Sequence, residues 1–546
     1  MAYLILFLWA IRALKSELFW LYLLQLKEYK LNRLIDHFRT EKGKRVLLDR
    51  INLFKVLLVL ASSFIYNNLA NIVLIIYIIE SAAAARNIYR GAILKPIATS
   101  KSTALTVILV AIQAAFGWTT FVYAFDMNEL AKYLIVFDIL IPAISISVIM
   151  LLKPANLLLK QGVIKQAKEK KEKLQNLLVI GITGSYGKTS TKEFLREILK
   201  NRFNVIATPE HVNTEIGIAN FMLNKVTPKH EIFICEMGAY EKGEIKAICD
   251  IVQPKIGIFI GANEQHLSLF GSMEELLSAE GGEELLSALP NGNSDKGLGI
   301  FNGNNKYAYD LYKKASIPKK ITYVPNLIEI INPEKRDARA ENINVRKDHV
   351  AVNIITNKNS KGVEFKINLL GSYNIENILL CVALAEALGM NLEEIKRASK
   401  DIAPLRRAMS ILKNSNGVNV INSTYSSNPS AVEAHLDYLK VWGSAKKVVI
   451  MPCLIELGSA SSKIHMNIGR SLAKIADLSI IAAKDKFADI LSGGEAAIGK
   501  NAARDKIVYI ENAKQIFEKI KSFCKKGDVI LLEGRLPEKL IELLEK

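Results

Sequence analysis

Long apolar segments occupy the first 152 residues of the chain. The stretch 102–125 carries no charged residue, and 133–152 contains only Asp138. A helix needs about 20 apolar residues to cross the hydrocarbon core of a bilayer, so both stretches are predicted to span a membrane. The region 53–79 is also apolar but is interrupted at Tyr66-Asn67-Asn68. It could cross once or turn back there, and about four membrane helices are expected in all.

After residue 176 the pattern changes to short apolar runs that alternate with amphipathic segments. Such runs are typical of buried strands, and their alternation with helices predicts a parallel α/β sheet. The expected strands are 177–182, 232–235, 256–260, 418–421, 447–451, 478–482, 506–510 and 528–532. A lysine-rich linker, 153–175, separates them from the apolar region.

The net charge of +18 comes mainly from three basic stretches, 27–50, 86–101 and 153–175. Each one flanks an apolar segment. Basic residues beside hydrophobic spans are explained by the positive-inside bias and by anionic lipid headgroups. A lipid bilayer is therefore the expected partner, and nucleic acid is not. The same bias predicts a multi-pass protein of the cytoplasmic (inner) membrane, with most of the chain in the cytoplasm. A lone acid such as Asp138 is expected to be structural and to have a partner, because unpaired charges are costly in apolar surroundings.

The segment 183–190 reads Thr-Gly-Ser-Tyr-Gly-Lys-Thr-Ser and follows the first predicted strand. Glycines there let backbone N–H groups surround phosphate oxygens, while Lys188 supplies a positive charge and the Thr189 hydroxyl can hold Mg²⁺. Glu236 and His266 follow the next two predicted strands, and the carboxyl ends of parallel strands meet at one ligand crevice. They are candidate ligands of a phosphate-bound metal, although a helix-capping Glu and a surface His are the alternatives.

Six motifs occur in an order that resembles the Mur ligase family, over about residues 176–546. The similarity is greatest to the members that add D-alanyl-D-alanine to UDP-N-acetylmuramoyl-tripeptide. The motifs are 183–190, Thr-Pro-Glu-His-Val-Asn-Thr-Glu-Ile-Gly (208–217), Glu-Met-Gly-Ala (236–239), His-Leu-Ser-Leu-Phe-Gly-Ser (266–272), Gly-Ser-Tyr-Asn-Ile-Glu-Asn (371–377) and Tyr-Ser-Ser-Asn-Pro (425–429).

The resemblance implies an α/β protein with a P-loop central ATP-binding domain (176–408) and a Rossmann-like C-terminal domain (409–546), and the apolar pattern places transmembrane helices (1–152) before them. It implies an ATP- and Mg²⁺-dependent carbon–nitrogen ligase of peptidoglycan precursor synthesis. A substrate carboxylate would form an acyl phosphate, which an amine then displaces. The implied partners are ATP, a muramoyl-peptide precursor and D-alanyl-D-alanine.

The resemblance also implies a set of site residues. Catalysis is assigned to Lys188, His266 and Glu280, and the metal to Thr189, Glu236, His266 and Glu280. The nucleotide contacts are Gly184, Ser185, Gly187, Lys188, Thr189, Ser190, Asn374, Asn377, Arg407 and Asn422.

Three departures from the family pattern leave alternatives open. Glu280 stands where the family carries a carbamylated lysine, and it could offer its carboxylate directly or be a solvated helix acid. Asn422 replaces an acid that resembles a ribose contact. The family's soluble UDP-sugar domain is absent, and apolar helices stand in its place. The alternatives are a ligase acting on another, lipid-linked carboxylate and a nucleotide-binding membrane scaffold with weakened catalysis; the oligomeric state is unknown.

Overall fold

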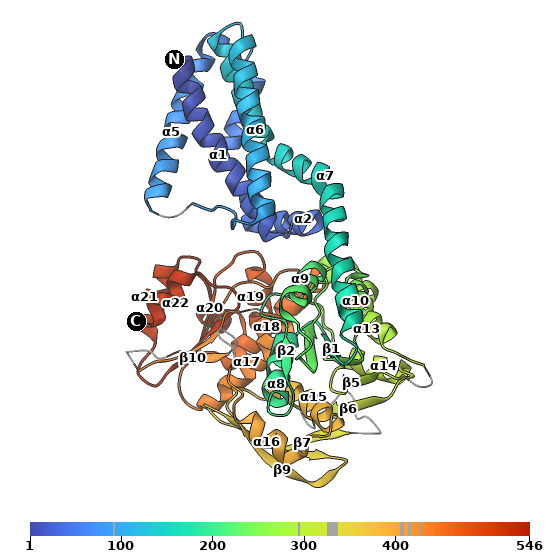
Figure 1. The fold of residues 1–546 in the computed structure, drawn as a ribbon. Coiled ribbons are helices and arrows are strands. Elements are labelled where there is room, and N and C mark those ends of the chain that lie inside the picture. The colour runs from blue at the N-terminus through green and yellow to red at the C-terminus, as the bar shows by residue number, and fades with distance from the viewer. Residues whose placement is uncertain are drawn as a thin grey trace. The chain divides into compact units, whose positions relative to one another are not determined.

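The computed structural model describes residues 1–47, 49–90, 93–292, 295–324, 337–404, 409–412, 417–425 and 427–545. The chain divides into two compact units, 1–160 and 161–546, and each is described by itself (Figure 1).

The first unit is helical, and in it α1 packs against α5 and α6 (Figure 1). The predicted span 102–125 corresponds to α6, and 133–152 lies within α7. The helical path is interrupted at the asparagines, where the short 3-10 helix η1 lies between α4 and α5. The elements are α1 (Ala2–Leu26), α2 (Leu31–Arg39), α3 (Glu41–Leu47), α4 (Arg50–Leu60), η1 (Tyr66–Asn68), α5 (Leu69–Tyr89), α6 (Ser100–Tyr123) and α7 (Met127–Lys173), of which the first part belongs to this unit.

Within the described part of the chain, three segments are long and apolar enough to cross a membrane: 66–89, 100–123 and 127–154. This follows from length and composition alone, and no membrane is in the structure.

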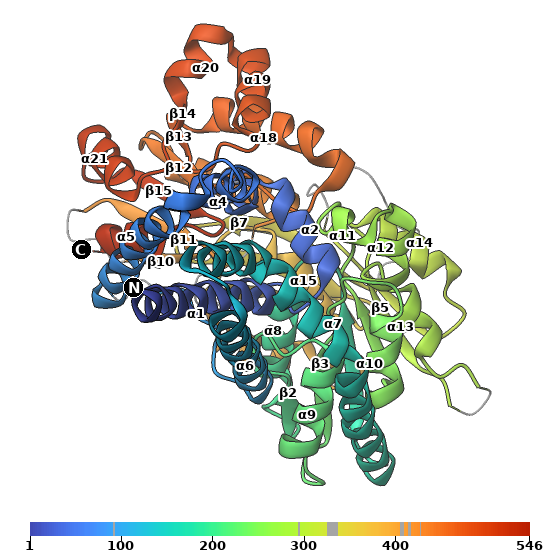
Figure 2. The ribbon, with the colours of Figure 1, turned by 90° about the horizontal axis from the view of Figure 1, so that it is seen from above.

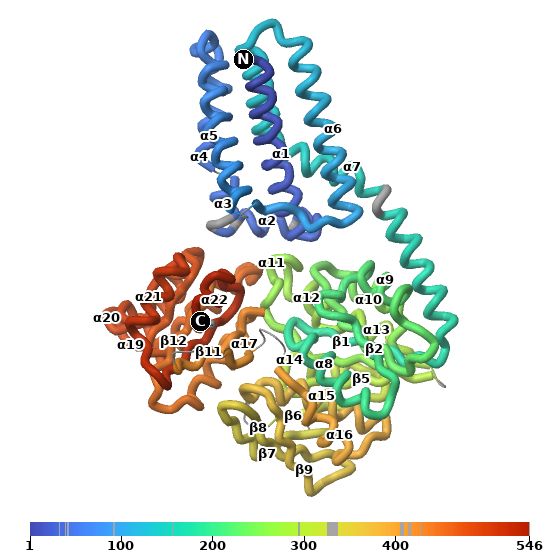
Figure 3. Tube along the Cα trace, turned by 60° about the vertical axis from the view of Figure 1, so that its left-hand side comes forward, coloured from blue at the N-terminus to red at the C-terminus, as the bar shows by residue number. Residues whose placement is uncertain are grey.

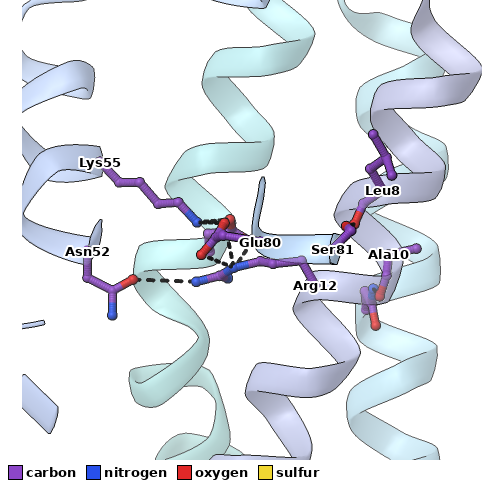
Figure 4. A network of polar contacts seen from close by, with 9 residues as sticks. Leu8, Ala10, Arg12, Asn52, Lys55, Glu80 and Ser81 are labelled. Carbon is purple, nitrogen blue, oxygen red and sulfur yellow. Dashed lines mark hydrogen bonds and ion pairs between the residues drawn. The ribbon is translucent and has the colours of Figure 1, made fainter. Parts of the chain in front are cut away.

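A buried ion network joins α1, α4, α5 and α7 inside the helical unit (Figure 4). Asp138 pairs with Arg12 at 2.7 Å and with Lys55 at 3.0 Å. Glu80 pairs with the same two cations, with its Oε2 3.4 Å from Arg12 Nε. The side chains of Lys55 and Asp138 are fully buried. The expectation that Asp138 is a structural acid with a partner is therefore confirmed, and it has two.

The second unit contains a nine-stranded sheet in the order β2-β3-β1-β4-β5-β6-β7-β8-β9. The strands from β2 to β7 are parallel to their neighbours, and β8 and β9 are antiparallel additions. They are β1 (Leu178–Thr183), β2 (Val205–Ala207), β3 (Ile232–Glu236), β4 (Ile256–Phe259), β5 (Leu298–Asn302), β6 (Lys319–Tyr323), β7 (Ala338–Val345), β8 (Val350–Thr356) and β9 (Asn359–Ile367).

Helices cover both faces of this sheet because successive side chains of its strands point to opposite sides. Ile180 belongs to the core beneath α8 and α15, whereas its neighbour Val179 belongs to the core beneath α9 and α10 (Figure 3). The helices are α8 (Lys188–Leu199), α9 (Glu215–Lys225), α10 (Glu244–Val252), α11 (Leu267–Phe270), α12 (Met273–Ala279), α13 (Glu283–Ala288), α14 (Lys306–Lys314), α15 (Asn374–Ala387) and α16 (Leu392–Ser399).

A second sheet follows, in the order β10-β11-β15-β12-β13-β14, and it is parallel except for β10. Its strands are β10 (Ser410–Leu412), β11 (Asn419–Ser423), β12 (Lys447–Met451), β13 (Leu478–Ile481), β14 (Ile507–Tyr509) and β15 (Val529–Glu533). The flanking elements are α17 (Pro429–Tyr438), η2 (Leu439–Trp442), η3 (Gly458–Ala460), α18 (Ser461–Ile475), α19 (Phe487–Ile498), α20 (Lys500–Lys506), α21 (Ala513–Phe523) and α22 (Glu538–Glu545).

This sheet is also covered on both faces. One face packs on α17, α18 and α19, and the other on α21 and α22; α18, α19 and α20 lie together beside β13 and β14 (Figure 2). Each of the eight strands expected from apolar runs is present within one or two residues of its predicted bounds. The predicted α/β class is therefore confirmed.

Candidate active site

The phosphate loop connects β1 to α8, in the strand–loop–helix context that its sequence predicts. Gly187 has φ 70°, a left-handed conformation that favours glycine. A Cβ at this position would also come within 2.8 Å of Asn377 Oδ1. The loop thus lies directly against the start of α15, and α8 begins at Lys188 with its N-terminal N–H groups at the end of the loop. This geometry suits a phosphate group.

Lys188, Glu280 and His266 are brought together at the carboxyl edge of the first sheet. Glu280 Oε1 lies 3.7 Å from Lys188 Nζ and 3.1 Å from His266 Nδ1. The Lys188 ammonium also donates to the carbonyl of Gly184 in its own loop. Glu280 is 2% exposed. It is therefore not a solvated helix acid, and its carboxylate faces the histidine and the loop lysine.

The electrostatics of this group favour an ionised Glu280. Burial by itself would raise the pKa of the Glu280 carboxyl, but the Lys188 ammonium and the His266 imidazole outweigh that effect, and its pKa is lowered. A buried negative charge next to the phosphate loop is therefore available to a cation.

Glu236 lies at the end of β3, and other groups hold its carboxylate. Lys192 Nζ, fully buried on α8, lies 3.1 Å from Glu236 Oε2, and Asn213 Nδ2 lies 3.3 Å from Oε1. Among the described residues no group of three or more His, Cys, Asp or Glu side chains is placed to hold a metal. The structure thus joins His266 to Glu280 but does not bring Glu236 to them.

The predicted nucleotide contacts lie at two separate places, one beside each sheet. Ser190 and Asn374 line one small cavity together with Phe194 and Tyr373, and Asn377 contacts the phosphate loop at Gly187. These side chains come from α8 and α15, which pack side by side.

Asn422 lies near the carboxyl end of β11, at the edge of the second sheet where its parallel strands end. Its Oδ1 accepts hydrogen bonds from the backbone N–H and the hydroxyl of Thr424, at 3.1 and 2.7 Å. Arg407 lies outside the described residues.

Two residues near the site were missed at the sequence level. Lys192 is one turn beyond the loop, and its fully buried ammonium neutralises Glu236. Glu456, which precedes η3 in the second sheet's domain, places its Oε2 3.5 Å from His266 Nε2. The Glu-Leu-Gly sequence at 456–458 was the available signal, but nothing in it indicated contact with a histidine 190 residues earlier.

The donor set fits a phosphate-bound Mg²⁺. Oε2 of Glu280 and the hydroxyl of Ser185 are both buried, and the Ser185 side chain interacts with the Glu280 carboxylate and helps to lower its pKa. Mg²⁺ prefers oxygen ligands and is commonly held by one or two carboxylates together with substrate phosphates. Glu280 and the Thr189 hydroxyl could supply such contacts, and Lys188 could accompany them on the phosphates.

Comparisons with known proteins agree with this arrangement. Residues 182–385 match the Mur ligase middle domain, and 407–536 match the Mur ligase glutamate ligase domain. The UDP-N-acetylmuramoyl-tripeptide–D-alanyl-D-alanine ligase of Bacillus subtilis is 24% identical over 377 residues, 67% of this chain and 75% of the relative. The enzyme of the same name from Escherichia coli is 26% identical over 62% of this chain and 70% of its own length.

Solved structures show the same fold. A crystal structure of MurF from Acinetobacter baumannii matches with a TM-score of 0.62 and 22% identity, over 71% of this chain and 81% of that one. The MurF ligase of Thermotoga maritima in complex with ADP matches with a TM-score of 0.58 and 22% identity, over 71% and 83%.

The same comparisons correct the predicted location. The relatives are named for a ligase reaction on UDP-N-acetylmuramoyl-tripeptide, and the expectation of a multi-pass protein of the inner membrane is contradicted. The expectation rested on apolar length and flanking charge, and these criteria identify candidate helices without showing a membrane around them.

The two domain matches, the shared fold and the ordered motifs confirm the prediction of a ligase that depends on ATP and Mg²⁺. The chain belongs to the Mur ligase family.

Proposed function

We propose that this protein adds D-alanyl-D-alanine to a muramoyl-tripeptide in peptidoglycan precursor synthesis, through an acyl phosphate. The observation that carries the proposal is the group formed by Lys188, Glu280 and His266, with distances of 3.7 and 3.1 Å, at the end of a phosphate loop. The relatives that share this part of the chain are named for that reaction. Residues 176–408 and 409–546 are proposed as the two ligase domains.

The chain's own residues account for the first step. Lys188 and the N-terminus of α8 bind the terminal phosphates of ATP and balance their charge. An oxygen of the substrate carboxylate attacks the γ-phosphorus, the bond from that phosphorus to the β,γ-bridging oxygen breaks, and ADP leaves with the electron pair. Mg²⁺, held by Glu280 and Thr189, would supply further neutralisation of the phosphate oxygens.

Glu280 takes on the role that the family gives to a carbamylated lysine. Both groups present one negative charge through oxygen atoms. In this chain the carboxylate is already buried, ionised and beside Lys188. No carbamate is then needed to complete the charge of the site.

The test is ADP release by the purified full-length protein with ATP and Mg²⁺, with and without UDP-N-acetylmuramoyl-tripeptide and D-alanyl-D-alanine. We expect release to require both substrates and the pentapeptide product to be detected by mass. Lys188→Ala and His266→Ala are each expected to abolish turnover while the circular dichroism spectrum of the protein stays unchanged.

Other outcomes would redirect the proposal. Nucleotide binding without stimulation by these substrates would contradict the proposed acceptor and favour a different, lipid-linked carboxylate. The family models match residues 182–385 and 407–536, which follow the helical unit, so the match does not extend to that unit. No nucleotide binding at all would leave a scaffold. Retained turnover in both variants would refute the site assignment.

A further inference from the structure

Both ring nitrogens of His266 face carboxylates, and the two carboxylates come from different domains. Nδ1 lies 3.1 Å from Glu280 on the first sheet's domain, and Nε2 lies 3.5 Å from Glu456 on the second sheet's domain. Glu280 is enclosed beside Lys188, while the Glu456 side chain retains 13% exposure. Glu280 therefore lies on the side of the imidazole that faces the phosphate loop, and Glu456 lies on the opposite side.

The backbone fixes this contact from both sides. His266 has φ 65° and Glu456 has φ 67°, so two non-glycine residues in the left-handed region meet at one point. The N–H of Ser268 donates to the carbonyl of Glu456 at 3.1 Å. Conformations of this kind cost free energy and persist where the surroundings enforce them. The backbones of the two segments are therefore held together at this point.

Two buried polar atoms near His266 are without hydrogen-bond partners in the described part of the chain. They are Oε1 of Gln265 and the hydroxyl of Ser268. Buried polar atoms without partners are rare in folded proteins and need an explanation. A polar ligand seated here would satisfy them.

We propose that Glu456 binds the ammonium group of the incoming amino substrate and positions its nitrogen for attack on the acyl phosphate. This inference rests on the proposed function and adds the residue that receives the second substrate. An α-amino group has a pKa of about 8 and is mostly protonated at neutral pH, so its natural partner is a carboxylate. Glu280 faces Lys188 and the phosphate loop, which leaves Glu456 for the ammonium.

The bond changes of this step balance. The bound ammonium loses one proton to water, and the nitrogen lone pair attacks the carbonyl carbon of the acyl phosphate. The new C–N bond forms, the bond from that carbon to the phosphate oxygen breaks, and phosphate leaves with the electron pair. The nitrogen loses a second proton to water and becomes the amide N–H. Glu456 acts by orienting the nitrogen, which is where an enzyme gains rate from proximity.

The test replaces Glu456 by Gln in the full-length protein and compares two acceptors. Hydroxylamine is uncharged near neutral pH and traps an acyl phosphate as a hydroxamate without needing a carboxylate. D-Alanyl-D-alanine arrives as an ammonium. We expect Glu456→Gln to raise the KM for the dipeptide and to lower kcat/KM by about 30-fold or more, as loss of a buried charge partner does. ATP-dependent hydroxamate formation should stay within about threefold of wild type, because acyl phosphate formation does not use this residue.

Matched variants separate charge from fold. Glu456→Asp keeps the charge and should recover part of the dipeptide reaction, and Glu518→Gln, an exposed acid on α21, should leave both reactions unchanged. Equal dipeptide kinetics in Glu456→Gln and wild type would overturn the assignment, and so would parallel loss of hydroxamate formation. Absence of hydroxamate in the wild type would instead refute the proposed function.

Discussion

Removal of the Asp138 charge should destabilise the helical unit more than any conservative change on its surface. Asp138 is fully buried and pairs with Arg12 at 2.7 Å and Lys55 at 3.0 Å. Asp138→Asn keeps the shape of the side chain and removes the charge. Of the two acids in the network, only Glu80 then remains to pair with Arg12 and Lys55 (Figure 4). The network changes from balanced to a net charge of one in an apolar core.

The size of the effect follows from these distances. With an effective dielectric constant of about 20, unit charges 2.7 to 3.0 Å apart attract by roughly 6 kcal/mol before desolvation is subtracted. Measured losses for one partner of a buried pair are about 3–5 kcal/mol, because the partner left behind stays buried. We expect a loss of that size, which is about two to three and a half orders of magnitude in the unfolding equilibrium.

Tryptophan fluorescence during chemical denaturation measures this loss. Trp9, Trp20 and Trp118 lie in the helical unit, so a Trp442→Phe background restricts the signal to it. The control is Lys55→Met combined with Asp138→Leu, which removes one charge of each sign.

The control should cost much less than Asp138→Asn, since an apolar replacement of a whole buried pair is often neutral. A loss below about 1 kcal/mol for Asp138→Asn, or equal losses for both proteins, would refute this reasoning.

Three further predictions concern the second unit. Glu280→Gln should lower ATP turnover about 100-fold or more, as measured by ADP release, because the charge facing Lys188 is lost. Asn422→Asp should tighten ADP binding about fivefold in calorimetry, because a charged acceptor strengthens a ribose contact while Thr424 can still donate to it; weaker binding would contradict this. Burial raises the pKa of Glu376 to about 7, so the folded state favours the neutral acid and loses stability as pH rises from about 4.5 to 7. Glu376→Gln should therefore be more stable than wild type by about 1 kcal/mol near pH 5 and about 3 kcal/mol at pH 8, and a pH-independent difference in the free energy of unfolding would count against it.

Each strand that the sequence predicted has a parallel neighbour, and all of them except the edge strand β14 lie inside their sheets. A parallel strand that is buried on both faces forms a continuous apolar run, as in Ile232–Glu236, where every residue is buried. Strands β2, β5, β6, β7, β8, β9 and β10 were not predicted, and four of these, β7 to β10, form antiparallel pairs. In Ala338–Val345 only the first four residues alternate between buried and partly exposed, and the rest include no buried residue, so no apolar run marks this strand.

Only part of the candidate site could likewise be predicted from the sequence. The phosphate loop was predictable because its glycines, lysine and hydroxyl residues are consecutive. Glu280 could be proposed from the family resemblance, as the residue at the position of the carbamylated lysine, but only the fold shows it in contact with His266 at 3.1 Å. Lys192 and Glu236 are 44 residues apart, and their pairing depends on α8 packing near the end of β3. Contacts of that kind cannot be read from local spacing.

The environment of Glu280 also determines how the site should respond to bicarbonate. A carbamylated lysine holds its negative charge only while carbon dioxide is bound, whereas Glu280 has a permanent carboxylate whose pKa is lowered by Lys188 and His266 against the effect of burial. Because this carboxylate already lies 3.7 Å from the Lys188 ammonium, no longer group is required to reach the phosphates. ATP turnover in buffers depleted of carbon dioxide should therefore equal turnover in bicarbonate. Stimulation by bicarbonate would mean that another residue carries a carbamate and that Glu280 does not complete the site.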